Sequence, residues 1–413
     1  MERYLSYKPS GVKWLGEIPS HWEMKRWRFL MSENTTKNSN CKERLQLQFR
    51  YGDIVRKTNQ SEESDVLDTI SKYTIVEPDD IMINGLNLNY DFISQRVAQV
   101  QERGVITSAY ISLRPTEIAN SRYFTYFLKS MDAKKMFHGM GTGIRLTLSY
   151  NELKNQFIPC PSPDEQSAIA AYLDTATAKI DAAIAQQQKM IDLLNERKQI
   201  IINRAVTKGL NPNAKMKDSG VEWIGEVPEG WEIRRLKYLL RQITAPSLSL
   251  NKIGLENIES GTGKFIKTNS EYEGNGVQFE KGDILYGKLR PYLKKVFLAE
   301  ESGNAVGDFF VFRPNAKVDG RYMQLVLLSQ TLTDEINSST YGAKMPRVSI
   351  DYMGGLNIPW PSLDEQKAIV EYIHKDCRPI DDAIDVADKQ ISLLQERKQI
   401  IINEVVTGKV RVV

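Results

Sequence analysis

Two stretches of the chain, 164–204 and 364–404, carry its clearest hydrophobic pattern. In each stretch, apolar residues recur in alternating steps of four and three, the spacing that forms the seam of a coiled coil. Gln187 is the single interruption in the first copy. The predicted seam residues are Ile180, Ile184, Ile191, Leu194 and Ile201, and then Ile380, Ile384, Ile391, Leu394 and Ile401.

A single helix with this narrow seam would be only marginally stable in water, so it needs a partner. We expect the two seams to pack on each other in an antiparallel pair, although each stripe could instead pack on its own domain. Pro379 lacks a backbone N–H and is tolerated mainly in the first turn of a helix. The sequence therefore predicts a short helix (364–373), a break and a long helix (379–404), with a matching pair at 164–173 and 179–204.

The seams belong to a longer internal repeat. SGVKWLGEIPSHWE at 10–23 returns as SGVEWIGEVPEGWE at 219–232, with 9 of 14 positions identical. PSPDEQSAI at 161–169 returns as PSLDEQKAI at 361–369, and IDLLNERKQIIIN at 191–203 returns with 11 of 13 positions identical. Two copies of one domain-plus-helix unit in one chain predict a monomer with pseudo-two-fold symmetry.

Between the repeated blocks lie two variable stretches, 24–158 and 233–358, which resemble each other only faintly. Each has short apolar runs bounded by turn residues, followed by a helical pattern at 121–137 or 320–337, which indicates domains of the α+β class. The predicted strands are Ile81–Ile83, Val97–Val100, Ile111–Leu113, Ile284–Tyr286, Lys295–Leu298 and Phe309–Phe312. We therefore expect a domain at 1–158, a helical spacer at 159–210, a second domain at 211–358 and a second spacer at 359–413.

Composition narrows the possible functions. The net charge of +3 permits nucleic-acid binding without requiring it. Three widely separated cysteines support neither a disulfide framework nor a zinc site, and the absence of an apolar signal core or membrane-length run predicts a cytoplasmic protein. Phosphate loops, dinucleotide fingerprints, methyltransferase motifs and metal-ligand clusters are all absent from the sequence. The sequence thus predicts a binding protein with no catalytic residues of its own.

Four polar loops of the variable stretches, at 84–96, 138–149, 286–295 and 341–349, carry the candidate binding chemistry. Amide and guanidinium groups can read base edges, lysine meets phosphate, and glycine lets the backbone approach a phosphate closely. Ordinary solvated loops would have the same composition, so that alternative stays open. The candidate DNA-binding residues are Asn87, Asn89, Tyr90, Arg96, Thr142 and Arg145, and then Lys288, Arg290, Tyr292, Lys294, Lys344 and Arg347.

Several motifs of the chain are shared with one protein family: the repeated boxes, the PSxDEQxxI and LLxERKQIIIN blocks, and the GDILYGKLRPYLKKV and AKMPRVS motifs. In these motifs the chain resembles the specificity subunit of type I restriction-modification systems. The resemblance covers essentially the whole chain. The first variable stretch departs from it, with NLNYDFISQR and GIRL in place of the KLRPYLKK and MPR motifs.

The resemblance implies two target-recognition domains, each reading one half of a bipartite sequence in double-stranded DNA, and a pair of long helices between them. It also implies docking of two methylation subunits and of restriction subunits, with S-adenosylmethionine, ATP and Mg bound by those partners and no cofactor in this chain. Two alternatives remain at this point. One is a self-contained restriction or modification enzyme, which would need a catalytic domain beyond the repeats. The other is a coiled-coil scaffold whose variable domains bind protein.

Overall fold

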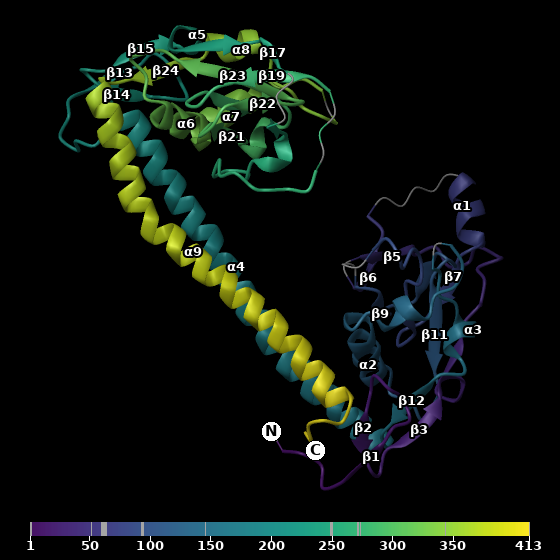
Figure 1. Cartoon of the computed structure of the whole chain (residues 1–413). Helices are drawn as coiled ribbons and strands as arrows, with labels where there is room; N and C mark the ends of the chain where they lie inside the picture. Colours follow the sequence, from purple (N-terminus) through teal and green to yellow (C-terminus); the bar gives the residue numbers. More distant parts are fainter. Residues whose placement is uncertain are drawn as a thin grey trace. The chain divides into compact units, whose positions relative to one another are not determined.

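The structure, a computed structural model, describes residues 2–50, 52–58, 64–91, 95–144, 146–247, 251–270, 272, 274–342 and 344–412. The chain forms two compact units (Figure 1). Unit 1 consists of Met1–Gln187 and Lys389–Val413, and unit 2 of Gln188–Asp388. The last residues of the chain therefore fold with the first, and each long helix supplies residues to both units.

Unit 1 is built around an antiparallel sheet with the strand order β4-β11-β8-β9, in which Ile111 lies opposite Ile83. The helix α2 packs beside β9, and its N-cap is Asn120, whose side chain accepts a hydrogen bond from Tyr123 N (2.9 Å). The strands are β1 (Tyr7–Pro9), β2 (Glu17–Pro19), β3 (Glu23–Arg26), β4 (Met31–Glu33), β5 (Leu47–Arg50), β6 (Asp53–Arg56), β7 (Thr74–Val76), β8 (Ile81–Ile83), β9 (Val97–Gln99), β10 (Gly104–Ile106), β11 (Ile111–Pro115) and β12 (Phe157–Cys160). The short helices are η1 (Trp27–Phe29), α1 (Ser64–Ser71), α2 (Ser121–Ala133), η2 (Met136–Gly139) and α3 (Tyr150–Leu153).

Unit 2 repeats this order of elements, and its central sheet, β16-β23-β20-β21, has the same arrangement. A second sheet, β17-β19-β22-β18, is added beside it. The strands are β13 (Met216–Asp218), β14 (Glu226–Pro228), β15 (Glu232–Arg235), β16 (Leu240–Ile243), β17 (Pro246–Ser247), β18 (Lys252–Ile253), β19 (Gly276–Phe279), β20 (Ile284–Gly287), β21 (Val296–Leu298), β22 (Gly303–Ala305), β23 (Phe309–Pro314) and β24 (Asn357–Trp360). The short helices are α5 (Leu236–Leu239), η3 (Leu255–Asn257), η4 (Pro291–Leu293), α6 (Gly320–Leu328), α7 (Gln330–Ser338) and α8 (Ile350–Gly355).

The predicted α+β class is confirmed, and all six predicted strands are present within a residue or two of the expected ends. The predicted helix at 121–137 ends at Ala133, and the one at 320–337 is divided at Ser329 into α6 and α7. Ser329 has an extended backbone (ψ 143°), and its hydroxyl donates to Val326 O (2.7 Å). This local bond offers the backbone an alternative to continued helix.

The predicted break in the long helices is wrong. The helix α4 runs without interruption over Pro163–Lys208, and α9 runs over Leu363–Val406 with Pro379 in its interior. Pro379 lies on the exposed face of α9, so the carbonyl that loses its intrahelical partner faces water. Cys377 and Ile380 on either side of it are buried, and their packing holds the two turns in line.

The predicted antiparallel seam is confirmed within each unit. In unit 1, Ile180 near the start of α4 belongs to the same core as Ile401 near the end of α9. In unit 2, Ile202 near the end of α4 belongs to the same core as Ile373 near the start of α9. All ten predicted seam residues are buried or half-buried.

Two lysines continue the same heptad spacing and pair across the helices. In unit 1, Lys398 Nζ lies 2.7 Å from Asp181 Oδ1, and in unit 2, Lys198 Nζ lies 2.6 Å from Asp381 Oδ1. The same pair thus occurs in both copies of the repeat. Pairing a seam lysine with an acidic residue of the facing helix favours one register over shifted ones, the use of polar seam residues that is best attested in coiled coils.

The first repeated box packs on the start of α4, and the two ends of the chain meet in the same unit. Trp22 is fully buried, and its Nε1 donates to Glu165 Oε1 (2.9 Å) at the start of α4. The Tyr4 hydroxyl donates to the same carboxylate oxygen (2.7 Å). Near the other end, Arg411 N donates to Glu2 O (2.8 Å). Residues from both termini therefore complete the core of unit 1.

Candidate nucleic-acid interface

The two candidate loops of unit 2 lie side by side. Arg290 N donates to Pro346 O (2.8 Å), and Val348 N donates to Lys288 O (3.1 Å). The second loop is itself a tight hairpin, because Tyr341 and Arg347 exchange two backbone hydrogen bonds of 3.1 and 3.0 Å. We name residues 287–294 and 341–348 together the unit 2 loop pair. Two segments far apart in sequence thus form one surface.

The unit 2 loop pair presents cationic and aromatic side chains to solvent. Tyr292 is 51% exposed and Tyr341 is 60% exposed, and Arg290, Lys344 and Arg347 are also exposed. Arg290 and Lys294, at the two ends of η4, both have left-handed backbones with φ of 51° and 48°. Such backbones persist in residues other than glycine only where the surroundings impose them. For Arg290, the backbone bond to Pro346 and the following Pro291 supply that constraint.

Asp308, which sequence reasoning missed, joins two of the predicted cations. Its carboxylate oxygens lie 3.0 Å from Arg347 Nη2 and 3.7 Å from Lys288 Nζ, and its carbonyl accepts from Lys288 N (2.9 Å). The only sequence signal was an acidic residue after Gly307 in the turn that leads into β23. A turn is a common place for aspartate, so that signal does not point to a binding role by itself.

Unit 1 has the same loop arrangement with different side chains. Leu88 N donates to Leu146 O (3.2 Å) and Leu148 N donates to Gly85 O (2.9 Å), the counterparts of the two bonds in unit 2. Gly85 permits this approach, because a Cβ there would lie 2.5 Å from the Leu148 carbonyl oxygen. Residues 85–90 together with 141–148 form the unit 1 loop pair.

The exposed side chains of the unit 1 loop pair are mostly neutral. Asn87 and Thr142 are exposed, Tyr90 is 75% exposed and Ile144 is 95% exposed. Asn89 is half-buried and donates to Ile144 O (3.2 Å) across the two loops, so it braces the pair. Arg145, also predicted to bind DNA, lies outside the described residues.

Two of the predicted DNA-binding residues, Arg96 and Lys294, have buried side chains that bind other parts of the protein. Arg96 is 0% exposed, and its guanidinium donates to Asn84 O (3.0 Å), Leu86 O (2.8 Å) and Asp91 O (2.7 Å). It therefore supports the unit 1 loop pair from within. Lys294 is 8% exposed and donates to Gln199 Oε1 of α4 (3.2 Å), and burial lowers the pKa of its ammonium.

Arg96 has a counterpart in unit 2. Asn84 N donates to Arg96 O and Gly287 N donates to Lys295 O, each at 2.8 Å, so Lys295 occupies the same place in the fold. The Lys295 ammonium donates to Leu255 O (2.7 Å) and Ile258 O (3.0 Å), which lie in and after η3. In both units, then, a cation at the end of the loop binds backbone carbonyls.

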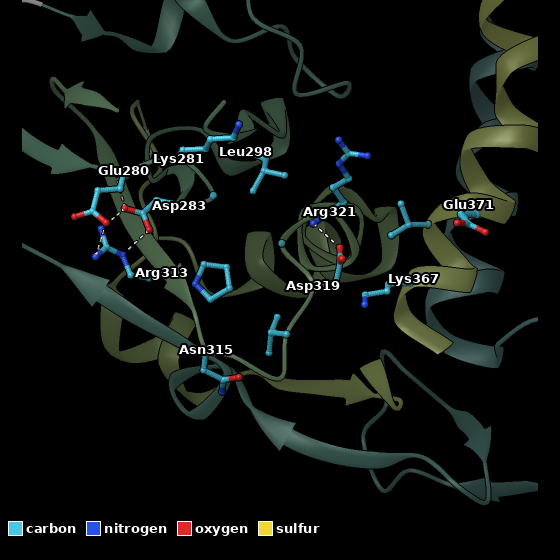
Figure 2. A pocket seen from close by; sticks show the side chains of 15 residues that line it. Glu280, Lys281, Asp283, Leu298, Arg313, Asn315, Asp319, Arg321, Lys367 and Glu371 are labelled. Carbon is cyan, nitrogen blue, oxygen red and sulfur yellow. Dashed lines mark hydrogen bonds and ion pairs between the residues drawn. The ribbon is translucent and has the colours of Figure 1, made fainter. Parts of the chain in front are cut away.

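A depression on unit 2 between the sheet, α6 and α9 has ionisable lining residues (Figure 2). Asp283 there is nearly fully buried and accepts two hydrogen bonds from Arg313, each of 2.8 Å, and Asp319 caps α6 by accepting from Arg321 N. Asp80 and Arg114 form the same pair in unit 1. These pairs anchor turns of the sheet. Within the described ranges, we find neither a group of three potential metal ligands nor a helix long and apolar enough to cross a membrane.

The sequence and the fold are both similar to those of known proteins. The family described as Type I restriction modification DNA specificity domain matches residues 52–191 and 228–383. The MjaVIII specificity subunit of Methanocaldococcus jannaschii is 25% identical over 367 residues, covering 83% of this chain and 81% of the relative. The EcoDI specificity subunit of Escherichia coli is 25% identical over 278 residues, covering 61% of this chain and 62% of the relative.

Among solved structures, a chain from a type I R-M system, studied for complex assembly and conformational transition, has a TM-score of 0.65 and 13% identity. The match covers 95% of this chain and 99% of the other, so the two share a fold. The family match covers well over half of the present chain, in both variable stretches. The chain therefore belongs to the type I restriction modification DNA specificity family, the family of the specificity subunits.

Proposed function

We propose that this specificity subunit binds a bipartite site in double-stranded DNA, with the unit 1 loop pair reading one half and the unit 2 loop pair reading the other. One observation carries the proposal. The same two-loop arrangement, held by the same backbone hydrogen bonds, occurs in both units, while its exposed side chains differ. A conserved frame with variable side chains is what two readers of different base sequences require.

The side chains of each loop pair favour different contacts. Arginine reads guanine through the O6 and N7 acceptors, and lysine mainly meets phosphate. Arg290, Arg347 and Lys344 thus suit unit 2 to a half-site that contains guanine. In unit 1, Asn87 suits adenine, and Thr142 accepts or donates to several base edges.

The proposal extends to a non-catalytic role in a larger complex. The long helices would dock two methylation subunits, and restriction subunits would join them, with S-adenosylmethionine, ATP and Mg bound by those partners. Such an assembly would act in the cytoplasm, where its DNA is found. The isolated chain should then transfer no methyl group from S-adenosylmethionine to DNA. Methylation by the purified chain alone would refute this part.

The decisive experiment maps methylated adenines in DNA from cells that express the complete complex. Residues 233–358 are then exchanged for the corresponding stretch of another specificity subunit. We expect one half of the methylated sequence to change while the other half and the non-specific gap stay the same. An exchange of 24–158 is the matched control and should change the opposite half. Changes in both halves after either exchange would refute independent reading.

A binding assay separates DNA recognition from the alternative of a protein-binding scaffold. The full chain is titrated with a duplex carrying the mapped site at several salt concentrations. Phosphate contacts predict that the logarithm of the affinity falls linearly with the logarithm of the salt concentration. A chain that binds DNA with no salt dependence and no preference for the mapped site would favour the scaffold.

A further inference from the structure

We propose that Asp308 is a positioning residue that makes Arg347 a guanine-reading side chain in the half-site bound by unit 2. The inference rests on the proposed function, because it concerns how one of the two loop pairs discriminates between bases. Its starting point is the carboxylate of Asp308, which lies between two of the cations expected to face DNA.

The geometry fixes one end of the Arg347 side chain. Asp308 Oδ2 lies 3.0 Å from Arg347 Nη2, the one side-chain hydrogen bond recorded for this guanidinium among the described residues. A guanidinium has five N–H donors in a planar fork, so most of them stay available. Arg347 is 44% exposed, against 25% for Asp308, so the arginine is the more accessible partner. Anchoring one end reduces the conformational freedom that the side chain would lose on binding a base.

The backbone on which both residues stand is also fixed. Arg347 N and O both bond to Tyr341, and Lys288 N, next to the same carboxylate, donates to Asp308 O (2.9 Å). The Lys288 ammonium also lies 5.8 Å from the centre of the Phe310 ring. Asp308 therefore joins the start of one loop to the closing residue pair of the other. A bidentate contact with guanine needs this kind of fixed position.

The charge balance argues against a simple phosphate site. Lys288 and Arg347 together carry two positive charges, and Asp308 cancels one of them. A carboxylate among cations lowers the affinity for any phosphate backbone, which would be a disadvantage if these residues served only non-specific binding. In unit 1, the alignment of YISLRP with FFVFRP places Ala109 where unit 2 has Asp308. The arrangement is thus specific to unit 2 and to the half-site that it reads.

The test compares Asp308→Asn, which keeps the size of the side chain and removes its charge, with the wild-type full chain. The control is Glu301→Gln, the same change at an exposed residue between β21 and β22. Two duplexes are used, one with the mapped site and one with its second half scrambled. We expect Asp308→Asn to lower the affinity ratio between them by about tenfold. Its non-specific binding should strengthen, with a salt slope steeper by up to about one, because Lys288 and Arg347 become free to contact phosphates. Asp308→Glu should keep part of the discrimination, and Glu301→Gln should change neither quantity.

A modified base identifies the contact itself. Each guanine of the second half-site is replaced in turn by 7-deazaguanine, which lacks the N7 acceptor. Wild-type protein should lose affinity at one such position, and both Arg347→Ala and Asp308→Asn should be insensitive there. In an Arg347→Ala background, Asp308→Asn should cause no further loss of discrimination.

Several results would overturn the inference. One is a second half-site without guanine on either strand. Another is an unchanged affinity ratio in Asp308→Asn while the wild type discriminates well. A third is an equal loss on both duplexes with a lower melting temperature, which would make Asp308 a structural brace only. If the wild-type chain itself shows no preference for the mapped site, the proposed function fails first, and this inference fails with it.

Discussion

Replacement of Arg96 by alanine should destabilise unit 1 and abolish base discrimination in the half-site that unit 1 reads. The guanidinium is fully buried and donates three hydrogen bonds of 2.7–3.0 Å to the carbonyls of Asn84, Leu86 and Asp91. Its backbone N–H also binds the buried side chain of Asp132 (2.7 Å). The substitution would remove the Arg96 donor from all three carbonyls, of which Asp91 O also contacts His138 Nε2 (3.2 Å), and it would leave a cavity beneath the loop.

The size of the effect follows from these contacts. A hydrogen bond from a charged group contributes about 1.5–3 kcal/mol, and three bonds from one group are not additive. Leaving a buried carbonyl without its donor costs about 1–3 kcal/mol, so for these contacts together we take about 3–5 kcal/mol as the expected loss for Arg96→Ala. At about 1.4 kcal/mol per factor of ten, amides in 84–91 should lose at least a hundredfold of their protection from hydrogen exchange.

The assay is hydrogen exchange read by mass spectrometry, combined with DNA binding by the full chain. Arg290→Ala is the matched control, because Arg290 is exposed and belongs to the unit 2 loop pair. That variant should stay within about 0.5 kcal/mol of the wild type in stability and weaken discrimination in the second half-site only. The reasoning is refuted if Arg96→Ala keeps wild-type protection while its DNA affinity falls on all sequences with a shallower salt slope. That result would mean that Arg96 contacts phosphate.

Two further predictions concern the long helices and the glycines that follow them. Lys398→Glu or Asp181→Lys alone should each destabilise the helix pair by about 0.5–1 kcal/mol, and the double exchange should recover most of that loss. Thermal unfolding of the wild type, the two single variants and the double variant measures the coupling. A double variant that loses as much stability as the two single variants added together would contradict the prediction. Gly408→Ala should lower the free energy of unfolding by about 2–4 kcal/mol, and Gly209→Ala should lower it by about 1 kcal/mol. Both glycines have φ near +70°, so the backbone cost is shared. A Cβ at 408 would lie 2.4 Å from the rigid Pro19 ring, whereas the nearest atom to a Cβ at 209 is 3.1 Å away. Equal unfolding free energies for the two glycine variants would show that the contact with Pro19 is not what matters.

The helical seam could be predicted from the sequence because it depends on local periodicity alone. Heptad spacing gave all ten seam residues, and the repeat of the pattern indicated that the two helices pair. The effect of Pro379 could not be predicted in the same way. Its cost is one hydrogen bond on a face that turned out to be exposed, and buried neighbours such as Ile380 offset that cost.

The candidate site was only partly predictable. The four loops were correctly singled out as polar and glycine-bearing, but their pairwise association depends on backbone hydrogen bonds such as that from Arg290 to Pro346, between residues far apart in sequence. Arg96 and Arg290 have the same side chain in similar loops, yet one is buried and the other exposed. Arg96 is buried because three backbone carbonyls fold around its guanidinium, and no local sequence pattern predicts where those carbonyls lie. Asp308 was missed for a related reason, since its role depends on the distant Arg347.

The composition of unit 1 has a consequence for the synthesis of the protein. A ribosome delivers residues 1–187 first, then roughly 200 residues of unit 2, and only then the segment from Lys389 onward that completes unit 1. At about 5–20 residues per second, this leaves a delay of roughly 10–40 s. During that time Ile180 is without packing partners such as Ile401, which belongs to the same core. The unit that begins first should therefore finish last, and a nascent chain stopped before Lys389 should hold a folded unit 2 beside an incomplete, protease-sensitive unit 1.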